Sequence, residues 1–133
     1  MKNHESAENY LEAIFVLGRG GRKVRAVDIA RELDFSKPSV SVAMKSLREK
    51  GHIEISGGHI LLTGSGRKIA ESIYERHVLL SDWLVSLGVS GETALEDACR
   101  LEHVLSQESF LAIKKHAEGR FSGKEEHWNG NLY

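Results

Sequence analysis

The sequence predicts a mostly α-helical fold with one small β-hairpin. Three observations in its 133 residues support this class. Apolar residues recur three or four positions apart before residue 50, they alternate between residues 53 and 62, and helical spacing returns after residue 66. Because helices repeat about every 3.6 residues and strands every two, these changes of spacing mark changes of element.

The first helix is expected from Ser6 until the glycine-rich segment 18–21 ends it. Tyr10, Ile14 and Leu17 then share one face of that helix. This helix therefore contributes an apolar stripe to the core of the first half.

Two more helices are expected on either side of a tight turn. The first covers residues 26–33, and Ser36 begins the second, because a serine hydroxyl can accept a backbone N–H of the first helical turn. Pro38 is tolerated there, since the N–H groups of a first turn lack helical partners. The second helix ends at Gly51 and buries a face formed by Val40, Met44 and Leu47.

A β-hairpin is expected after Gly51. Ile53 and Ile55 alternate with polar residues, Gly57 and Gly58 provide a turn, and Ile60 and Leu62 follow on the second strand. Two helices around a tight turn followed by such a wing form a winged helix–turn–helix, whose second helix enters the DNA major groove. Residues 1–70 are therefore expected to form a DNA-binding domain.

Residues 71–133 are expected to form a second, helical domain. A long helix from Gly66 to Gly88 links the two parts, and shorter helices follow over about 91–105 and 107–116. From residue 118 the chain is rich in glycine, charge and histidine. A loose C-terminal tail is expected there, although Trp128 and Tyr133 could dock.

Charge is divided unequally between the two halves. Up to Ala70 there are twelve Lys and Arg against eight Asp and Glu, and beyond it six against eleven, within a net charge of -1. The first half suits a polyanion and the second suits cations. The beginning of the chain lacks a signal peptide, and no stretch approaches the roughly 18 apolar residues of a membrane helix. A cytoplasmic protein is therefore expected.

The second helix of the motif presents a surface suited to a DNA groove. Short hydroxyl side chains can approach phosphates and base edges, a methyl-bearing side chain can touch thymine, and lysine or arginine can neutralise phosphate. The expected DNA-binding residues are Ser36, Lys37, Pro38, Ser39, Ser41, Val42, Lys45 and Arg48. Because no Arg or Gln fork faces the bases, part of the specificity is expected from DNA shape and from a dimer on two half-sites. A solvated helix in an ordinary helical domain is the alternative.

A metal site is expected in the second domain. Cys99, Glu102 and His103 lie at positions i, i+3 and i+4, so a thiol, a carboxylate and an imidazole share one helix face. His77 lies on the inward side of the long helix. The alternatives are a half-buried cysteine beside an exposed Glu–His pair, and a histidine that is only a hydrogen-bonded core residue. On the first helix, Asn9 and Glu12 are three residues apart and could aim at a shared point.

Five segments resemble the diphtheria toxin repressor family, which includes the manganese transport regulators. They are SAENYLEAIF, DIARELDFSKPSVSVAMKSLREKG, LTGSGRKIA, ERHVLLSDWL and EDACRLEHVLS, and the resemblance spans about residues 6–116. It implies a two-domain, dimeric, metal-activated repressor of the manganese-regulator type. It also places the metal ligands at Asn9, Glu12, His77, Cys99, Glu102 and His103.

The chain departs from the family pattern at the metal positions. Cys99 stands where manganese-type members carry a carboxylate, and Asn9 where the family has an aspartate or a methionine. Ser81 and Leu95 replace two ligands of the iron-type ancillary site. A thiolate adds affinity for softer divalent ions. Fe(II) is therefore expected as the favoured activator and Mn(II) second, with Zn(II), Co(II) or Ni(II) binding in vitro.

The expected function is transcriptional repression on double-stranded operator DNA, with control of metal-uptake genes and metal homeostasis. A homodimer is expected, with no membrane and no small-molecule substrate as partners, and no enzymatic activity. Two alternatives remain: a winged-helix regulator that senses oxidation through Cys99, and a small metalloenzyme with Cys99 as nucleophile and His77 or His103 as base.

Overall fold

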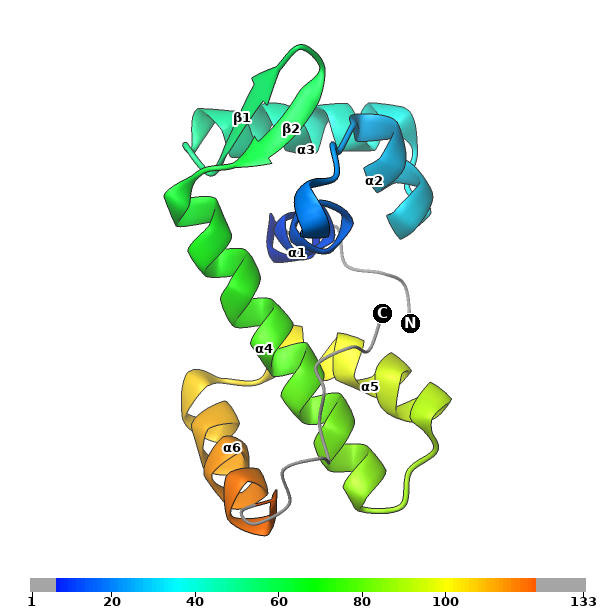
Figure 1. Ribbon diagram of the computed structural model, residues 1–133, viewed down its shortest axis with the longest axis vertical. Coiled ribbons are helices and arrows are strands. Elements are labelled where there is room, and N and C mark those ends of the chain that lie inside the picture. The colour runs from blue at the N-terminus through cyan, green and yellow to red at the C-terminus, as the bar shows by residue number, and fades with distance from the viewer. Residues whose placement is uncertain (1–6, 122–133) are drawn as a thin grey trace. The chain divides into compact units, whose positions relative to one another are not determined.

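The structure, a computed structural model, describes the backbone of residues 7–121 and the side chains of residues 7–119 (Figure 1). Within these residues it contains six α-helices, a short 3-10 helix and one two-stranded antiparallel sheet. The predicted fold class, a mostly helical protein with a small β wing, is confirmed. The chain divides into two compact units, which we call unit 1, up to Ser72, and unit 2, from Ile73 onward.

Unit 1 has the order helix, helix, helix, hairpin. Its elements are α1 (Ala7–Leu17), the 3-10 helix η1 (Arg19–Gly21), α2 (Ala26–Leu33), α3 (Lys37–Glu49), β1 (Ile53–Ser56) and β2 (His59–Leu62). The core is apolar, with Leu11, Ile29, Leu47 and Ile53 fully buried. These residues come from α1, α2, α3 and β1, so every element of the motif contributes to one core.

The turn between α2 and α3 follows from local chemistry. Asp34 ends α2 in the left-handed conformation, with φ 57° and ψ 44°. Ser36 then caps α3, because its Oγ accepts a hydrogen bond from the backbone N–H of Ser39 at 3.2 Å. Pro38 lies in the first turn of α3. The expected cap and turn are thus both present.

The wing is a tight hairpin. Ile53 pairs with Leu62 and Ile55 with Ile60. Gly57 and Gly58 both have positive φ, 57° and 81°, as a two-residue hairpin turn of this kind requires. The N–H of Ile60 also donates to the carbonyl of Val24 at 2.8 Å, which ties the wing to the segment before α2.

Helix α4 (Gly64–Ser86) begins two residues before the expected start at Gly66. The hydroxyl of Thr63 accepts the N–H of Gly66 at 3.3 Å and donates to the carbonyl of Gly51 at 2.7 Å, so Thr63 caps the helix and binds it to the end of α3. Gly66 cannot carry a side chain, because a Cβ there would lie 2.0 Å from the backbone oxygen of His52. The glycine that reads as a helix boundary is a site of close backbone approach.

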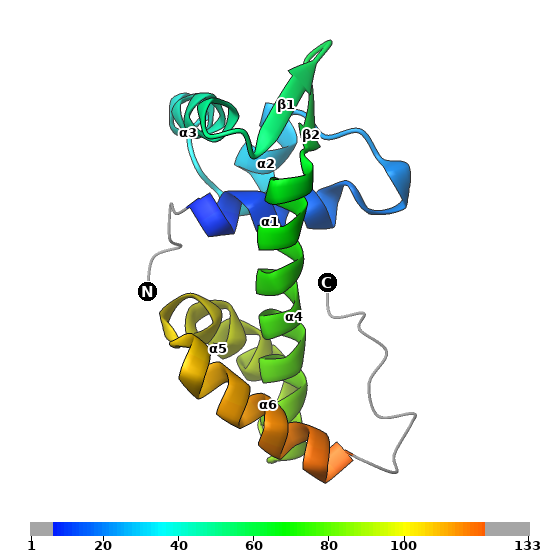
Figure 2. The ribbon, with the colours of Figure 1, turned by 90° about the vertical axis from the view of Figure 1, so that its left-hand side faces the viewer.

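Unit 2 consists of the remainder of α4 with α5 (Gly91–Val104) and α6 (Gln107–Phe121). Both views show α5 and α6 beside this part of α4 (Figures 1 and 2). Helix α6 continues to Phe121, so the expected end near residue 116 was wrong and residues 118–121 belong to the helix, whereas the rest of the expected tail lies outside the described residues. Ala117, fully buried, explains the extension because it keeps the last turns packed. Trp128 and Tyr133 lie outside the described residues.

The longest described helix is α4, with 23 residues. Charged residues interrupt it throughout, including Arg67, Glu71, Glu75 and Arg76. Among the described helices, none combines the length and the apolar content that crossing a membrane requires.

Candidate metal centre and nucleic-acid interface

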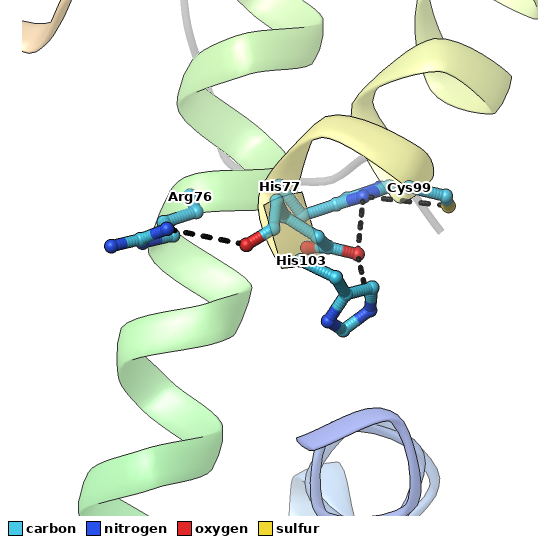
Figure 3. Close-up of polar contacts among 5 residues, drawn as sticks. Arg76, His77, Cys99 and His103 are labelled. Carbon is cyan, nitrogen blue, oxygen red and sulfur yellow. Dashed lines mark hydrogen bonds and ion pairs between the residues drawn. The ribbon is translucent and has the colours of Figure 1, made fainter. Parts of the chain in front are cut away.

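Four of the six expected metal ligands lie in unit 2. His77 is on α4 and is fully buried, with 0% of its surface exposed. Cys99, Glu102 and His103 occupy one face of α5, as their spacing requires. Figure 3 shows the side chains of His77, Cys99 and His103 gathered at one point between α4 and α5. Glu102 contacts both histidines there, as the distances below show.

The donor atoms of this cluster are closely spaced. The Sγ of Cys99 lies 3.6 Å from Nδ1 of His77. The same nitrogen lies 3.6 Å from Oε1 of Glu102, and that oxygen lies 3.6 Å from Nε2 of His103. One donor atom each from His77, Cys99 and Glu102 lie within 4.8 Å of one another. The three side chains thus form one compact donor set.

This donor set fits a divalent transition metal. Donors bound to one ion at roughly 2.0–2.3 Å lie about 3–4 Å apart, which is the spacing found here. Imidazole, thiolate and carboxylate together suit iron, cobalt, nickel and zinc. Glu102, only 2% exposed, is a carboxylate in a place where burial is costly unless charge and hydrogen bonds compensate it. A cation would compensate it directly.

The burial pattern is the reverse of the simplest alternative. A half-buried cysteine beside an exposed Glu–His pair is not what the structure shows, because Cys99 is exposed and Glu102 is buried. His103 is half-buried. The thiol of Cys99 is therefore accessible to an ion from solvent, whereas the carboxylate of Glu102 lies in the protein interior.

Asn9 and Glu12, the two other expected ligands, lie on α1 in unit 1. Glu12 is 5% exposed, and Asn9 is half-buried. Both make polar contacts. Their part in a metal site stays a prediction.

The candidate DNA-reading surface is the exposed side of α3. All but one of the eight expected DNA-binding residues are exposed, and Ser39 is half-buried. Val42 is 72% exposed, so its methyl groups are available for contact with a thymine methyl. Ser36 and Ser39 also hydrogen bond to each other at 3.0 Å, so the hydroxyls at the start of α3 hold the cap as well.

Comparison with known proteins identifies the family. Residues 3–59 match the family described as iron dependent repressor, N-terminal DNA binding domain, and residues 63–119 match its metal binding and dimerisation domain. The chain is 38% identical over 111 residues to transcriptional regulator MntR of Escherichia coli O6:H1 (strain CFT073), covering 83% of this chain and 72% of the relative. The chain belongs to the iron-dependent repressor family. The predicted resemblance is thereby confirmed, and so is the predicted class, the metal-dependent transcriptional regulators.

Other members of the iron-dependent repressor family are longer than the region matched. The iron-dependent repressor IdeR of Mycobacterium bovis is 33% identical over 106 residues, which cover 78% of this chain and 46% of the relative. A solved manganese-dependent transcriptional repressor, in complex with manganese, is 29% identical with a TM-score of 0.78. That match covers 84% of this chain and 52% of the other, so this chain spans about half the length of that repressor.

One residue of this repressor-family chain was missed by the sequence analysis. Arg76, next to His77 on α4 (Figure 3), donates hydrogen bonds to the backbone oxygens of Glu102 and Leu105. Its partners lie 26 and 29 residues away, so no local spacing could reveal them. The only signal in the sequence was the lack of a glycine at the end of α5, which leaves the last carbonyls of that helix in need of another partner.

Proposed function

We propose that this chain is a metal-dependent transcriptional repressor that binds operator DNA as a homodimer when loaded with Fe(II) or Mn(II), and that it controls metal-uptake genes in the cytoplasm. Residues 1–70 would read DNA, and residues 71–133 would hold metal and form the dimer. The observation that supports this most strongly is the cluster of His77, Cys99 and Glu102, in a chain that also carries an exposed helix α3.

We assign metal binding to His77, Cys99, Glu102 and His103, with Glu12 and Asn9 as the contribution of α1. A divalent cation, when bound, supplies the positive charge that holds thiolate, carboxylate and imidazole together. Cys99 must give up its thiol proton, and the histidines must be neutral to donate a lone pair. Burial of His77 and Glu102 orients both donors before any ion arrives, which lowers the ordering cost of binding.

The thiol of Cys99 makes Fe(II) the favoured ion. Manganese prefers oxygen ligands, whereas a thiolate adds affinity for ions further along the first transition row. The relatives include both kinds, an iron-dependent repressor and a repressor in complex with manganese. Zn(II), Co(II) and Ni(II) are expected to bind in vitro because raw affinity rises toward the end of the row.

We assign the coupling between metal binding and DNA binding to α1, because Asn9 and Glu12 are three residues apart on that helix and could reach one ion. If these side chains share the ion bound by α4 and α5, metal selects one orientation of the two recognition helices in the dimer. Operator DNA must then tighten metal binding by the same factor by which metal tightens DNA binding. Replacement of Glu12 by alanine should uncouple the two without removing the donors on α5.

DNA reading is assigned to α3. Lys37, Lys45 and Arg48 would neutralise phosphates, and Val42 would contact a thymine methyl. Because few groups here distinguish bases by bidentate hydrogen bonds, the spacing of two half-sites and DNA shape would supply the rest of the specificity.

The decisive experiment is a titration of operator DNA with the protein in the presence of Fe(II), Mn(II) or Zn(II). Salt must be held fixed, because phosphate contacts make DNA affinity salt-dependent. The double variant Cys99→Ala, His103→Ala should lose the metal response, whereas Glu118→Ala, which removes an exposed carboxylate on α6, should keep it. Unchanged DNA affinity on adding metal to the unsubstituted protein would refute the proposal.

Oxidation sensing through Cys99 is the second candidate. One observation favours it: the thiol is exposed and lies 3.6 Å from the imidazole of His77. Peroxide would then change DNA affinity in metal-free protein, and Cys99→Ser would abolish that change. The metal proposal expects peroxide to act only by destroying a ligand.

A further inference from the structure

Arg76 on α4 makes several polar contacts with the segment that joins α5 to α6. One nitrogen, Nη1, donates to the carbonyl of Leu105 at 2.9 Å and to that of Glu102 at 3.3 Å. The other, Nη2, donates to Oε1 of Gln107 at 2.6 Å. The guanidinium also lies 4.8 Å from the ring centre of Phe110. One side chain thus binds the last turn of α5 and the first turn of α6.

These contacts meet a need at the end of α5. The last carbonyls of a helix have no partner within it, and they carry partial negative charge. Here the helix ends at Val104 with Leu105 in an extended conformation, so no glycine turns back to satisfy them. The planar fork of arginine offers five donors in fixed directions, which a lysine ammonium does not. Arg76 therefore caps α5 from a neighbouring helix.

The same turn of α5 carries two of the candidate metal ligands. Arg76 and His77 are consecutive on α4, and both reach Glu102: Arg76 binds its backbone oxygen, and His77 lies 3.6 Å from its carboxylate. The position of the Glu102 main chain is thereby fixed next to the imidazole that its side chain must face. We propose that Arg76 is a positioning residue for the metal centre, which holds the Glu102–His103 turn at the distance from His77 that an ion requires. This inference rests on the proposed function.

Gln107 allows the role of Arg76 to be tested without changing Arg76 or any candidate ligand. It accepts a hydrogen bond from Arg76, is exposed, and is not one of the candidate ligands. Replacing it with alanine removes one anchor of the guanidinium and changes no charge. An effect of Gln107→Ala on metal binding would therefore pass through Arg76.

The test is titration of the full chain with Co(II), followed by the absorption band from the Cys99 thiolate to cobalt. Arg76→Met keeps the length of the side chain and removes the hydrogen bonds, and it should weaken Co(II) binding about tenfold. The band of the saturated variant should also shift in position or intensity, because the donors no longer meet at the same distances. Gln107→Ala should weaken binding about twofold to threefold. Arg100→Met is the matched control, since Arg100 lies on α5 but pairs with Asp97 on its own exposed face, and it should change neither quantity.

Two outcomes would overturn the inference alone, and a third would overturn the proposed function as well. If Arg76→Met lowers the thermal midpoint of the metal-free protein but binds Co(II) with unchanged affinity and an unchanged band, Arg76 is only structural. If Arg76→Met does not fold, Arg76→Lys is measured in its place. If that variant binds Co(II) with wild-type affinity and a wild-type band, the planar guanidinium of Arg76 is not needed to position the ligands, and the inference is overturned. If the unsubstituted protein shows no thiolate band at all, the proposed function fails together with this inference.

Discussion

Unit 1 and unit 2 are similar in size but bury different kinds of side chain. The core of unit 1 is formed by large apolar residues such as Leu11, Ile29 and Leu47. Among the residues of unit 1 that the structure describes, Glu12 is the one buried charged residue. Unit 2 also buries apolar residues, among them Val78, Leu80 and Phe110, but it additionally buries His77, Ser81 and Glu102 beside the small residues Ala94 and Ala98. Apolar burial contributes about 25 cal/mol per Å², whereas burial of a polar group costs free energy unless it is compensated.

The difference indicates which unit is built for stability and which for binding. A buried carboxylate and a buried imidazole facing an exposed thiol do little for a core, and buried ionisable groups gathered in this way are candidates for a functional site. Unit 1 needs a firm core because α3 must be presented as a rigid surface. In unit 2, part of the interior is occupied by His77 and Glu102, whose donor atoms are thereby held in fixed directions.

The largest effect on stability is expected in unit 1. Leu47→Ala removes a side chain that is 2% exposed from the centre of the apolar core and should lower the free energy of unfolding by about 2–5 kcal/mol. Urea denaturation measures this directly. Affinity of the folded protein for Co(II) should not change. If Leu47→Ala lowered the free energy of unfolding by less than about 1 kcal/mol, Leu47 would not lie in a well-packed apolar core of unit 1.

In unit 2 the corresponding substitution should act on binding and not on stability. Glu102→Leu replaces the buried carboxylate by an apolar side chain of similar volume, so the metal-free protein no longer bears the cost of burying that group and should be about as stable as the wild type. Affinity for Co(II) should fall by about a hundredfold or more, which corresponds to about 2.7 kcal/mol. Glu102→Gln, which keeps the shape but not the charge, should also bind metal weakly. If Glu102→Leu lowered the free energy of unfolding of the metal-free protein as much as Leu47→Ala does, Glu102 would serve stability as the core of unit 1 does, and the difference between the two units would be refuted.

The same contrast explains what could be predicted from the sequence. The elements of unit 1 follow from periodicity and caps: Ser36 and the pair Gly57–Gly58 each determine a local geometry that needs no distant partner. The start of α4 was misplaced because Gly66 resembles a boundary, whereas it is required by the backbone of His52, fourteen residues earlier. Local signals were sufficient except where two distant backbones meet.

The metal cluster could be predicted only in part. Cys99, Glu102 and His103 share a face through helical spacing alone, so their grouping needed no tertiary information. That His77 faces them, and that Arg76 caps their helix, depends on how α4 packs against α5. The burial of Glu102 and the exposure of Cys99 are set by the same packing, which explains why the sequence left that pattern open.

The smallest expected effect lies on the surface of unit 2, where Lys114 on α6 donates a hydrogen bond to Glu75 on α4 at 2.8 Å. This bond and the charge of Glu75 raise the pKa of Lys114 above its usual value. A raised pKa in the folded state contributes stability at pH values below the unfolded pKa, and this contribution is lost as pH rises through the folded value. Because both side chains are partly exposed, Lys114→Met should cost only about 0.2–1 kcal/mol at neutral pH.

That cost should shrink toward zero as the pH rises through the raised pKa of Lys114, where the lysine loses its charge, and it should also shrink at high salt. Urea denaturation across this pH range measures it, with Lys115→Met, an exposed neighbour on α6, as the control. A cost that persists undiminished at high pH would mean that Lys114 stabilises α6 through the packing of its aliphatic stem. In that case this part of the surface of unit 2, like the core of unit 1, would be held by apolar contact.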